Sequence, residues 1–131
     1  FEHKASGRII GYFSLANDRI SIDDFDNNTE FNRFRRHRFI NEKRIRSYPA
    51  VKICRLGINE KFHGKGIGSI ILNFIKSYFL EDNKTGCRFI TVDAYYKAIP
   101  FYQNNDFRHL RKEEEDIITR LLYYDLNDIA D

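Results

Sequence analysis

The sequence predicts a single α/β domain with a mixed, mostly antiparallel sheet and one parallel β-α-β crossover. The chain has 131 residues, about the length of one domain. Hydrophobic residues make up 42% of it and aromatic residues 15%, so it can bury a self-sufficient core and is neither disordered nor a disulfide scaffold. Its clearest periodic segment is an amphipathic helix between two apolar strands, which is the pattern of a parallel crossover.

The first half of the chain predicts three strands and a basic connecting segment. Residues 8–16 are rich in β-branched and aromatic side chains and predict a strand. Asn17-Asp18 is a turn signal, and the alternation of apolar and polar residues over 19–25 predicts the second strand of a hairpin. Residues 26–47 are polar and basic, with aromatic residues at a loosely helical spacing. Residues 50–58 are apolar and predict a strand buried on one or both faces.

The next segment predicts an amphipathic helix. Its apolar residues recur at the i, i+3, i+4, i+7 spacing of one helix face, and they are Ile67, Ile70, Ile71, Phe74, Ile75, Tyr78 and Phe79. We expect this stripe to pack against the sheet and the polar residues between its members to face solvent. These polar residues are Ser69, Asn73, Lys76 and Ser77. The composition of residues 83–86 predicts the end of the helix.

The second half of the chain predicts a buried strand, a short helix and two closing strands. Residues 88–94 are apolar, and their place after the helix implies a right-handed parallel crossover from the strand at residues 50–58. Residues 97–104 predict a short helix with a proline in its first turn, where proline is tolerated. Residues 107–110 and 117–126 predict two further strands that are joined by a charged turn.

Charge is unevenly distributed along the chain. The formal net charge is +3, but residues 1–66 carry 14 Lys and Arg against 8 Asp and Glu, whereas residues 67–131 carry 8 against 11. The positive excess is concentrated at Arg33, Arg35, Arg36, Arg38, Lys43, Arg44 and Arg46. Such a cluster is typical of a protein that binds a polyanion, although a solvated helix face would have the same composition.

Cysteine and histidine usage gives further expectations. Cys54 and Cys87 both lie within apolar segments, so we expect buried free thiols in a reducing compartment and place the protein in the cytoplasm. Neither cysteine has a nearby histidine, which argues against a catalytic thiol. The four histidines have no metal-ligand spacing, so we expect no metal. No apolar run approaches the roughly 18 residues of a membrane-spanning helix, so we expect no membrane partner.

The residues that indicate chemistry lie at the start of the amphipathic helix. His63-Gly64-Lys65-Gly66-Ile67-Gly68-Ser69 forms a glycine-rich turn that opens it. Glycine lets the backbone approach a ligand closely, and the first N–H groups of a helix have no partner within it. With the helix dipole, these groups predict a pyrophosphate site, although a flexible turn would look similar. The P-loop and dinucleotide patterns both fail, because Asn59 and Ser69 stand where they require glycine.

This turn resembles the acetyl-CoA loop of the GNAT superfamily of N-acetyltransferases, which reads (Q/R)-x-x-G-x-(G/A). His63 stands where the family has Gln or Arg. A second block, Ala98-Ile99-Pro100-Phe101-Tyr102 followed by Asp106-Phe107, is similar to the family's A-x-x-F-Y…G-F signature, with Asp106 in place of glycine. Arg55-Leu56-Gly57-Ile58 resembles the R-L-A-V strand of GNAT toxins that acetylate aminoacyl-tRNA. The resemblance covers about residues 8–126 and implies that the family's N-terminal strand and helices are missing, so we expect an N-terminally truncated domain.

The resemblance implies a cosubstrate and the residues that bind it. The cosubstrate is acetyl-CoA, bound across splayed parallel strands and held at its pyrophosphate by the glycine turn. The implied cofactor-binding residues are Leu56, Gly57, Ile58, His63, Gly64, Lys65, Gly66, Ile67, Gly68, Ser69 and Phe101.

The resemblance also implies direct attack of an amine on the thioester carbonyl. A backbone N–H near Ile58 would stabilise the developing oxyanion. Tyr102 matches the family's general acid, which protonates the departing thiolate, and a phenol with a pKa near 10 is protonated at neutral pH. The general base stays open, with Glu60, Asp93 and Tyr95 near the expected site and a water chain as the alternative.

Other functions and several acceptors remain open at this point. The chain could be a non-catalytic module that binds acyl-CoA or a protein partner, or a nucleic-acid-binding domain without a cofactor. For a transferase, the acceptor could be a small amine, a protein amine or an aminoacyl-tRNA bound through the basic cluster. The cluster could also reach the 3′-phosphate of the cofactor. The resemblance leaves a homodimer open.

Overall fold

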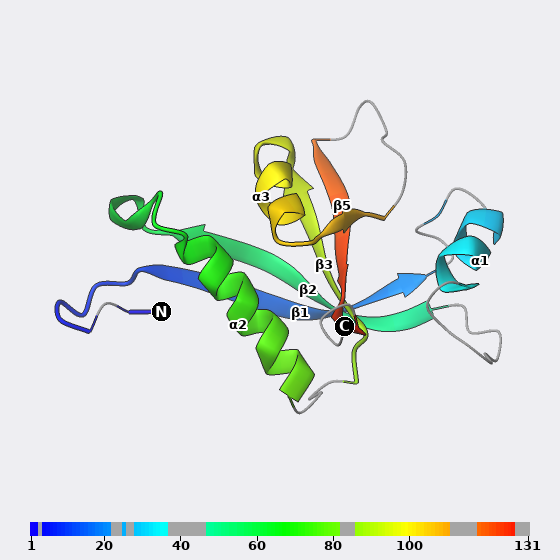
Figure 1. Cartoon of the computed structure of the whole chain (residues 1–131), viewed down its shortest axis with the longest axis horizontal. Helices are drawn as coiled ribbons and strands as arrows, with labels where there is room; N and C mark the ends of the chain where they lie inside the picture. Colours follow the sequence, from blue (N-terminus) through cyan, green and yellow to red (C-terminus); the bar gives the residue numbers. More distant parts are fainter. Residues whose placement is uncertain are drawn as a thin grey trace.

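A five-stranded sheet with helices on both faces forms the domain (Figure 1). The computed structural model describes residues 1–2, 4–21, 25, 28–36, 47–81, 86–110 and 118–127. In chain order the elements are β1 (Gly11–Ser21), α1 (Asn28–Arg36), β2 (Ser47–Ile58), η2 (Glu60–Phe62), α2 (Ile67–Glu81), β3 (Phe89–Tyr95), η3 (Tyr96–Ala98), α3 (Ile99–Asn104), β4 (Arg108–His109) and β5 (Thr119–Asp125). Within these described ranges, no helix is long and apolar enough to cross a membrane.

The strand order is β1-β2-β3-β5-β4, and it contains one parallel pair. β2 and β3 run parallel and α2 connects them, which confirms the predicted crossover. The pairs β1-β2, β3-β5 and β4-β5 are antiparallel. The fold is therefore the mixed, mostly antiparallel α/β arrangement that the sequence predicts.

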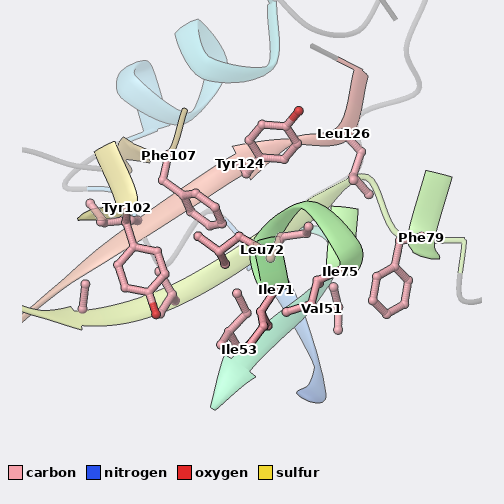
Figure 2. Close-up of a cluster of buried hydrophobic side chains, with 14 of the residues drawn as sticks. Val51, Ile53, Ile71, Leu72, Ile75, Phe79, Tyr102, Phe107, Tyr124 and Leu126 are labelled. Atoms are coloured by element: carbon pink, nitrogen blue, oxygen red, sulfur yellow. The ribbon is translucent and has the colours of Figure 1, made fainter. Parts of the chain in front are cut away.

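The larger core lies between the sheet and the helices α2 and α3 (Figure 2). Alternate residues of β2, β3 and β5 point to this face and meet the buried side of α2. The buried members are Val51, Ile53, Ile71, Leu72, Ile75, Phe79, Cys87, Ile90, Val92, Ala94, Tyr102, Phe107, Leu122, Tyr124 and Leu126. Burial of this apolar surface stabilises the fold and also fixes where α2 begins relative to the end of β2.

A second, aromatic core lies on the opposite face of the sheet, under α1. Phe31 and Phe34 are three residues apart and therefore share one face of α1. They pack against side chains at the beginnings of β2 and β3, including Tyr48 and Phe89, and against Tyr123 of β5. α1 thus covers the end of the sheet from which the two parallel strands start.

The predicted hairpin at residues 8–25 is wrong, because β1 continues through the expected turn. Asn17 and Asp18 lie in register opposite Val51 and Ala50 of β2, so the main chain of the long β2 strand holds them extended. The Asp18 carboxylate also accepts a hydrogen bond of 2.6 Å from the Thr91 hydroxyl on β3. Pairing with β2 therefore outweighs the local turn propensity of Asn17-Asp18.

α2 buries only part of the predicted apolar stripe, namely Ile71, Ile75 and Phe79, with Ile67 packed at the edge of the core. Ile70, Phe74 and Tyr78 belong to the predicted stripe but are between 44% and 55% exposed. Lys76, which we expected in solvent, is only 6% exposed and lies on the buried face beside Leu72. Apolar residues cover more than one side of α2, so spacing alone does not select the side that faces the sheet.

The prediction that both cysteines are buried is correct for Cys87 and wrong for Cys54, which is exposed. In the register of β1 with β2, consecutive β1 residues lie opposite Ile53 and Arg55, so Cys54 has no partner there. This extra residue is a β-bulge, which interrupts the alternation of side chains along the strand. Because Ile53 points into the core, alternation directs the Cys54 side chain to the other face of the strand, where it is exposed, and after the bulge Leu56 and Ile58 return to the core face.

Thiol labelling tests this arrangement of the two cysteines. In the folded protein, Cys54 should react rapidly with a reagent such as DTNB, whereas Cys87 should react only after unfolding, because its side chain lies in the core. The Cys54→Ser variant should lose the rapid reaction and retain the slow one. Rapid labelling of both thiols, or of neither, would contradict the described packing.

Candidate active site

The central feature of the candidate site is the point where β2 and β3 stop pairing. Their parallel register runs from Ala50 opposite Phe89 to Ile53 opposite Val92. β2 then continues to Ile58 without pairing to β3, and Figure 1 shows the two strands running apart. Main-chain groups on that side of β2 therefore face the space between the strands and are available to a ligand.

The bulge at Cys54 lies at the start of this unpaired stretch and sets the direction of the side chains that follow. After it, Leu56 and Ile58 point to the face of the sheet that carries α2 and α3. Gly57 points to the opposite face, where a Cβ atom would lie 2.5 Å from a ring atom of Tyr12. Gly57 thus allows the Tyr12 ring to cover the outer side of β2.

The glycine turn leads from the end of β2 into α2. Gly64 and Gly66 have φ angles of +75° and +72°, which non-glycine residues rarely adopt. The Nε2 atom of His63 donates a hydrogen bond of 2.9 Å to the Ile58 carbonyl and ties the turn to the strand. The Gly66 carbonyl accepts the bond from the Ile70 amide at 3.2 Å, so the first amides of α2 have no partner within the helix.

Gly68 brings α3 close to the start of α2. A Cβ atom at this position would lie 2.9 Å from two ring atoms of Phe101, so only glycine leaves room for that ring. Phe101 belongs to α3 and stands edge-on to Tyr102, with ring centroids 5.0 Å apart. The first turn of α2 and the aromatic residues of α3 consequently form one wall.

Tyr102 is a buried phenol at the edge of this site. Its ring packs against Phe107 at a centroid distance of 5.3 Å, and its hydroxyl lies at the end remote from Phe107 (Figure 2). Burial raises the pKa of Tyr102 above its ordinary value of 10.0. The phenol therefore stays protonated throughout the neutral range, which is the state that a general acid needs.

A pocket of about 460 Å³ joins these features. It is lined by Leu56, Ile58, Phe62, His63, Gly64, Gly66, Ile67, Gly68, Ser69, Ala98, Phe101 and Tyr102. Its volume is within the usual range for small-molecule sites, and apolar walls next to unpaired amides suit a ligand with an apolar arm and an anionic group. Most of the predicted site residues therefore meet in one place.

The pocket differs from the predicted set at four positions. Gly57 and Lys65 are not among its lining residues: Gly57 points to the other face, and the Lys65 ammonium lies 5.5 Å from the ring centroid of Phe62. Phe62 and Ala98 line the pocket and were not predicted. Ala98 belongs to the A-x-x-F-Y block, which is a usable signal, whereas Phe62 lies in the short helix η2 and no pattern marked it.

The candidates for a general base differ in their surroundings. Asp93 is ion-paired with Lys52, and its carboxylate, as the hydrogen-bond partner of the ammonium, raises the pKa of Lys52. Glu60 and Tyr95 are exposed. Within the described ranges, no group of three or more His, Cys, Asp or Glu side chains could hold a metal ion.

The described part of the basic cluster lies at the other end of the sheet from the pocket. Arg33 is exposed on α1, which packs beside Tyr48 at the start of β2. At the roughly 3.3 Å rise of a strand residue, Tyr48 and Ile58 are on the order of 30 Å apart. Arg35 and Arg36 belong to α1, whereas Arg38, Lys43, Arg44 and Arg46 lie outside the described residues.

Comparison with known proteins agrees with this geometry. Residues 4–109 match the family model described as an acetyltransferase (GNAT) domain. No curated protein matches the chain. Among solved structures, the crystal structure of a bacterial toxin is similar over 98% of this chain and 66% of its own, with a TM-score of 0.74 and 15% sequence identity.

Two further similar structures concern the protein AtaT. AtaT complexed with acetyl-methionyl-tRNAfMet matches 95% of this chain and 66% of its own, with a TM-score of 0.66 and 20% identity. AtaTR bound with AcCoA matches 94% of this chain and 65% of its own, with a TM-score of 0.62 and 20% identity. The similarity to these three structures shows the fold of the chain. The chain spans slightly less than two thirds of the length of each of them.

The close approach at Gly68 gives a stability prediction. Gly68→Ala should lower the free energy of unfolding by about 1–3 kcal/mol, because the added methyl overlaps the Phe101 ring. Urea unfolding measures the change. Adding Phe101→Leu, which shortens the opposing side chain, should make the double variant less destabilised than the sum of the single variants. If the losses of unfolding free energy in Gly68→Ala and Phe101→Leu simply added, the contact between Gly68 and the Phe101 ring would be contradicted. Ser77→Ala, on the exposed side of α2, is the control.

Proposed function

The chain belongs to the acetyltransferase (GNAT) family, and from this premise we propose that it is an N-acetyltransferase that moves an acetyl group from acetyl-CoA to a primary amine. One observation carries the proposal: a single pocket joins the unpaired amides at the start of α2, the unpaired end of β2 and the buried phenol of Tyr102. Each of these three parts matches a different requirement of acetyl transfer from a thioester.

The start of α2 would bind the pyrophosphate of acetyl-CoA. Amides that lack partners within the helix point toward the turn, and the dipole of this 15-residue helix adds partial positive charge there. Gly64 and Gly66 have open space where a Cβ atom would stand, so a bulky anion can approach their backbone. The Lys65 ammonium is exposed beside the turn and adds a positive charge.

The unpaired end of β2 would hold the pantetheine arm and the thioester. Main-chain groups of Leu56–Ile58 would pair with the amides of the arm, much as a neighbouring strand does, while the side chains of Leu56, Ile58 and Phe101 exclude water. Bound acetyl-CoA supplies the electrophilic thioester carbonyl. A fixed main-chain N–H near Ile58 would stabilise the negative charge that develops on its oxygen, a contribution of about 3 kcal/mol in comparable sites.

Tyr102 would act as the general acid. As the amine nitrogen forms a bond to the acetyl carbon, the carbon–sulfur bond breaks and the Tyr102 hydroxyl gives its proton to the thiolate. The proton lost by the amine passes to solvent, and solvent returns a proton to Tyr102. Because burial raises the pKa of Tyr102 above 10.0, the acid form is present over the whole neutral range.

We propose aminoacyl-tRNA as the acceptor. Arg33, an exposed basic residue of α1, lies on the order of 30 Å from the pocket along the sheet. A small amine would contact only the pocket, whereas a long polyanion could contact the pocket and Arg33 together. The complex of AtaT with acetyl-methionyl-tRNAfMet gives this choice independent support.

Removing the proposed acid tests the mechanism. Tyr102→Phe should lower kcat about 100-fold or more while acetyl-CoA affinity stays nearly unchanged, because the phenyl ring keeps the packing and loses only the proton donor. Thiol release measures turnover and calorimetry measures affinity. Tyr123→Phe is the matched control, since Tyr123 and Tyr102 are both 6% exposed and Tyr123 lies on the opposite face. Undiminished turnover in Tyr102→Phe would show that Tyr102 is not the general acid. If the unmodified protein bound acetyl-CoA without releasing the thiol of coenzyme A, a non-catalytic module would be favoured instead.

Salt dependence tests the acceptor. With aminoacyl-tRNA, kcat/KM should fall by about a factor of ten or more between 50 and 200 mM salt, because phosphate contacts release counterions, while acetyl-CoA affinity changes much less. Reversing the charge at Arg33 with Arg33→Glu should reduce kcat/KM for tRNA and leave that for a small amine unchanged. Activity that is insensitive to salt, or higher with small amines than with tRNA, would contradict this choice.

A further inference from the structure

The proposed reaction requires a fixed relation between two helices, because α2 carries the phosphate-binding amides and α3 carries Tyr102. α3 has six residues and is too short to be held by its own hydrogen bonds. Its polar connection to α2 passes through its C-cap residue, Asn105. Apolar packing holds the Tyr102 ring in the core, and the polar contacts of Asn105 join the end of α3 to α2.

Asn105 makes hydrogen bonds to both helices. Its side-chain Nδ2 donates to the Ser69 hydroxyl in the first turn of α2 at 3.2 Å and to the Phe101 carbonyl of α3 at 2.8 Å. Its main-chain amide donates to the Tyr102 carbonyl at 3.0 Å. One residue thus joins the start of α2 to the backbone of Phe101 and Tyr102, the two aromatic residues of α3 that line the pocket, without lining the pocket itself.

Lys76 of α2 holds Asn105 from the other side. Its Nζ donates a hydrogen bond of 2.6 Å to the Asn105 carbonyl, and it lies 4.1 Å from the ring centroid of Tyr124. Burial lowers the pKa of Lys76, and the nearby Asp106 carboxylate partly opposes this effect. A desolvated ammonium costs free energy, and the Asn105 carbonyl, the Tyr124 ring and the Asp106 carboxylate all offset part of this cost.

We infer that Asn105, held by Lys76, is a positioning residue that sets the place of the Tyr102 hydroxyl relative to the amides at the start of α2. The inference rests on the general-acid role proposed for Tyr102. Because Asn105 lies outside the pocket, its side chain acts through the backbone of α3. Loss of this side chain would leave the amides that bind the pyrophosphate in place and would release the helix that carries the acid.

A double-mutant cycle between Asn105 and Tyr102 tests the inference. Asn105→Ala should lower kcat about tenfold or more in the unmodified protein, with little change in the KM for acetyl-CoA. In the Tyr102→Phe background, the same substitution should change kcat less than about twofold, because the group that it positions is already absent. Lys76→Met, which keeps an unbranched apolar stem and removes the ammonium, should behave in the same way.

Asn104→Ala is the matched control, because it makes the same substitution at the neighbouring, exposed residue of α3 and should leave kcat unchanged in both backgrounds. An equal loss of rate from Asn105→Ala in both backgrounds would indicate general destabilisation and overturn the inference. Full activity of Asn105→Ala beside an impaired Tyr102→Phe would also overturn it and leave the proposed function intact. If Tyr102→Phe itself is fully active, the proposed acid role fails, and with it the inference.

Amide hydrogen exchange gives a readout that needs no acceptor. In protein saturated with acetyl-CoA, Asn105→Ala should speed exchange at the α3 amides while protection of the central turns of α2 stays unchanged. Asn104→Ala should leave both helices as protected as in the unmodified protein. Unchanged α3 protection in Asn105→Ala would mean that other contacts hold the helix, which overturns the inference whatever the kinetics.

Discussion

The end of pairing between β2 and β3 is the constraint on which the rest of the site depends. Strand backbone that lacks a neighbour must find other partners for its polar groups, either water or a bound molecule. Here the unpaired stretch follows the bulge at Cys54 and ends where the glycine turn leads into α2. A ligand that supplies an amide-bearing arm and a terminal anion satisfies both the strand and the first turn of the helix.

The helices then convert this opening into a pocket of defined shape. Gly68 allows the Phe101 ring to approach α2, and the bonds of Asn105 and Lys76 secure the end of α3. The apolar core beneath α2 positions its first turn, whereas the short α3 combines the apolar packing of Tyr102 and Phe101 with these polar bonds at its C-terminal end. Because α2 carries the proposed phosphate-binding amides and α3 carries Tyr102, substitutions that affect only one helix should separate cofactor binding from catalysis.

Local patterns in the sequence predict the crossover and the glycine turn of the pocket, and the resemblance to the GNAT family implies most of the other residues that line it. An amphipathic helix between two apolar strands indicates a parallel pair, and a glycine turn at a helix start indicates an anion site. Long-range pairing decides the rest. The partner strand β2 keeps Asn17-Asp18 extended, and Cys54 lies on an exposed face of β2. α2 has apolar residues on several sides, so its periodicity does not reveal that Lys76 is buried. Contacts such as that of Phe62 with the pocket leave no mark in the local sequence.

Amide chemical shifts in isotopically labelled protein test the central claim most directly, because they report on the backbone that is proposed to hold acetyl-CoA. Addition of the compound should give its largest perturbations at the amides of Gly66, Gly68 and Ser69, and smaller ones along the unpaired end of β2. Desulfo-coenzyme A, which keeps the pyrophosphate, should reproduce the helix signals. If the protein were saturated with acetyl-CoA and the amide shifts changed only in α1 or on the opposite face of the sheet, the account would be contradicted.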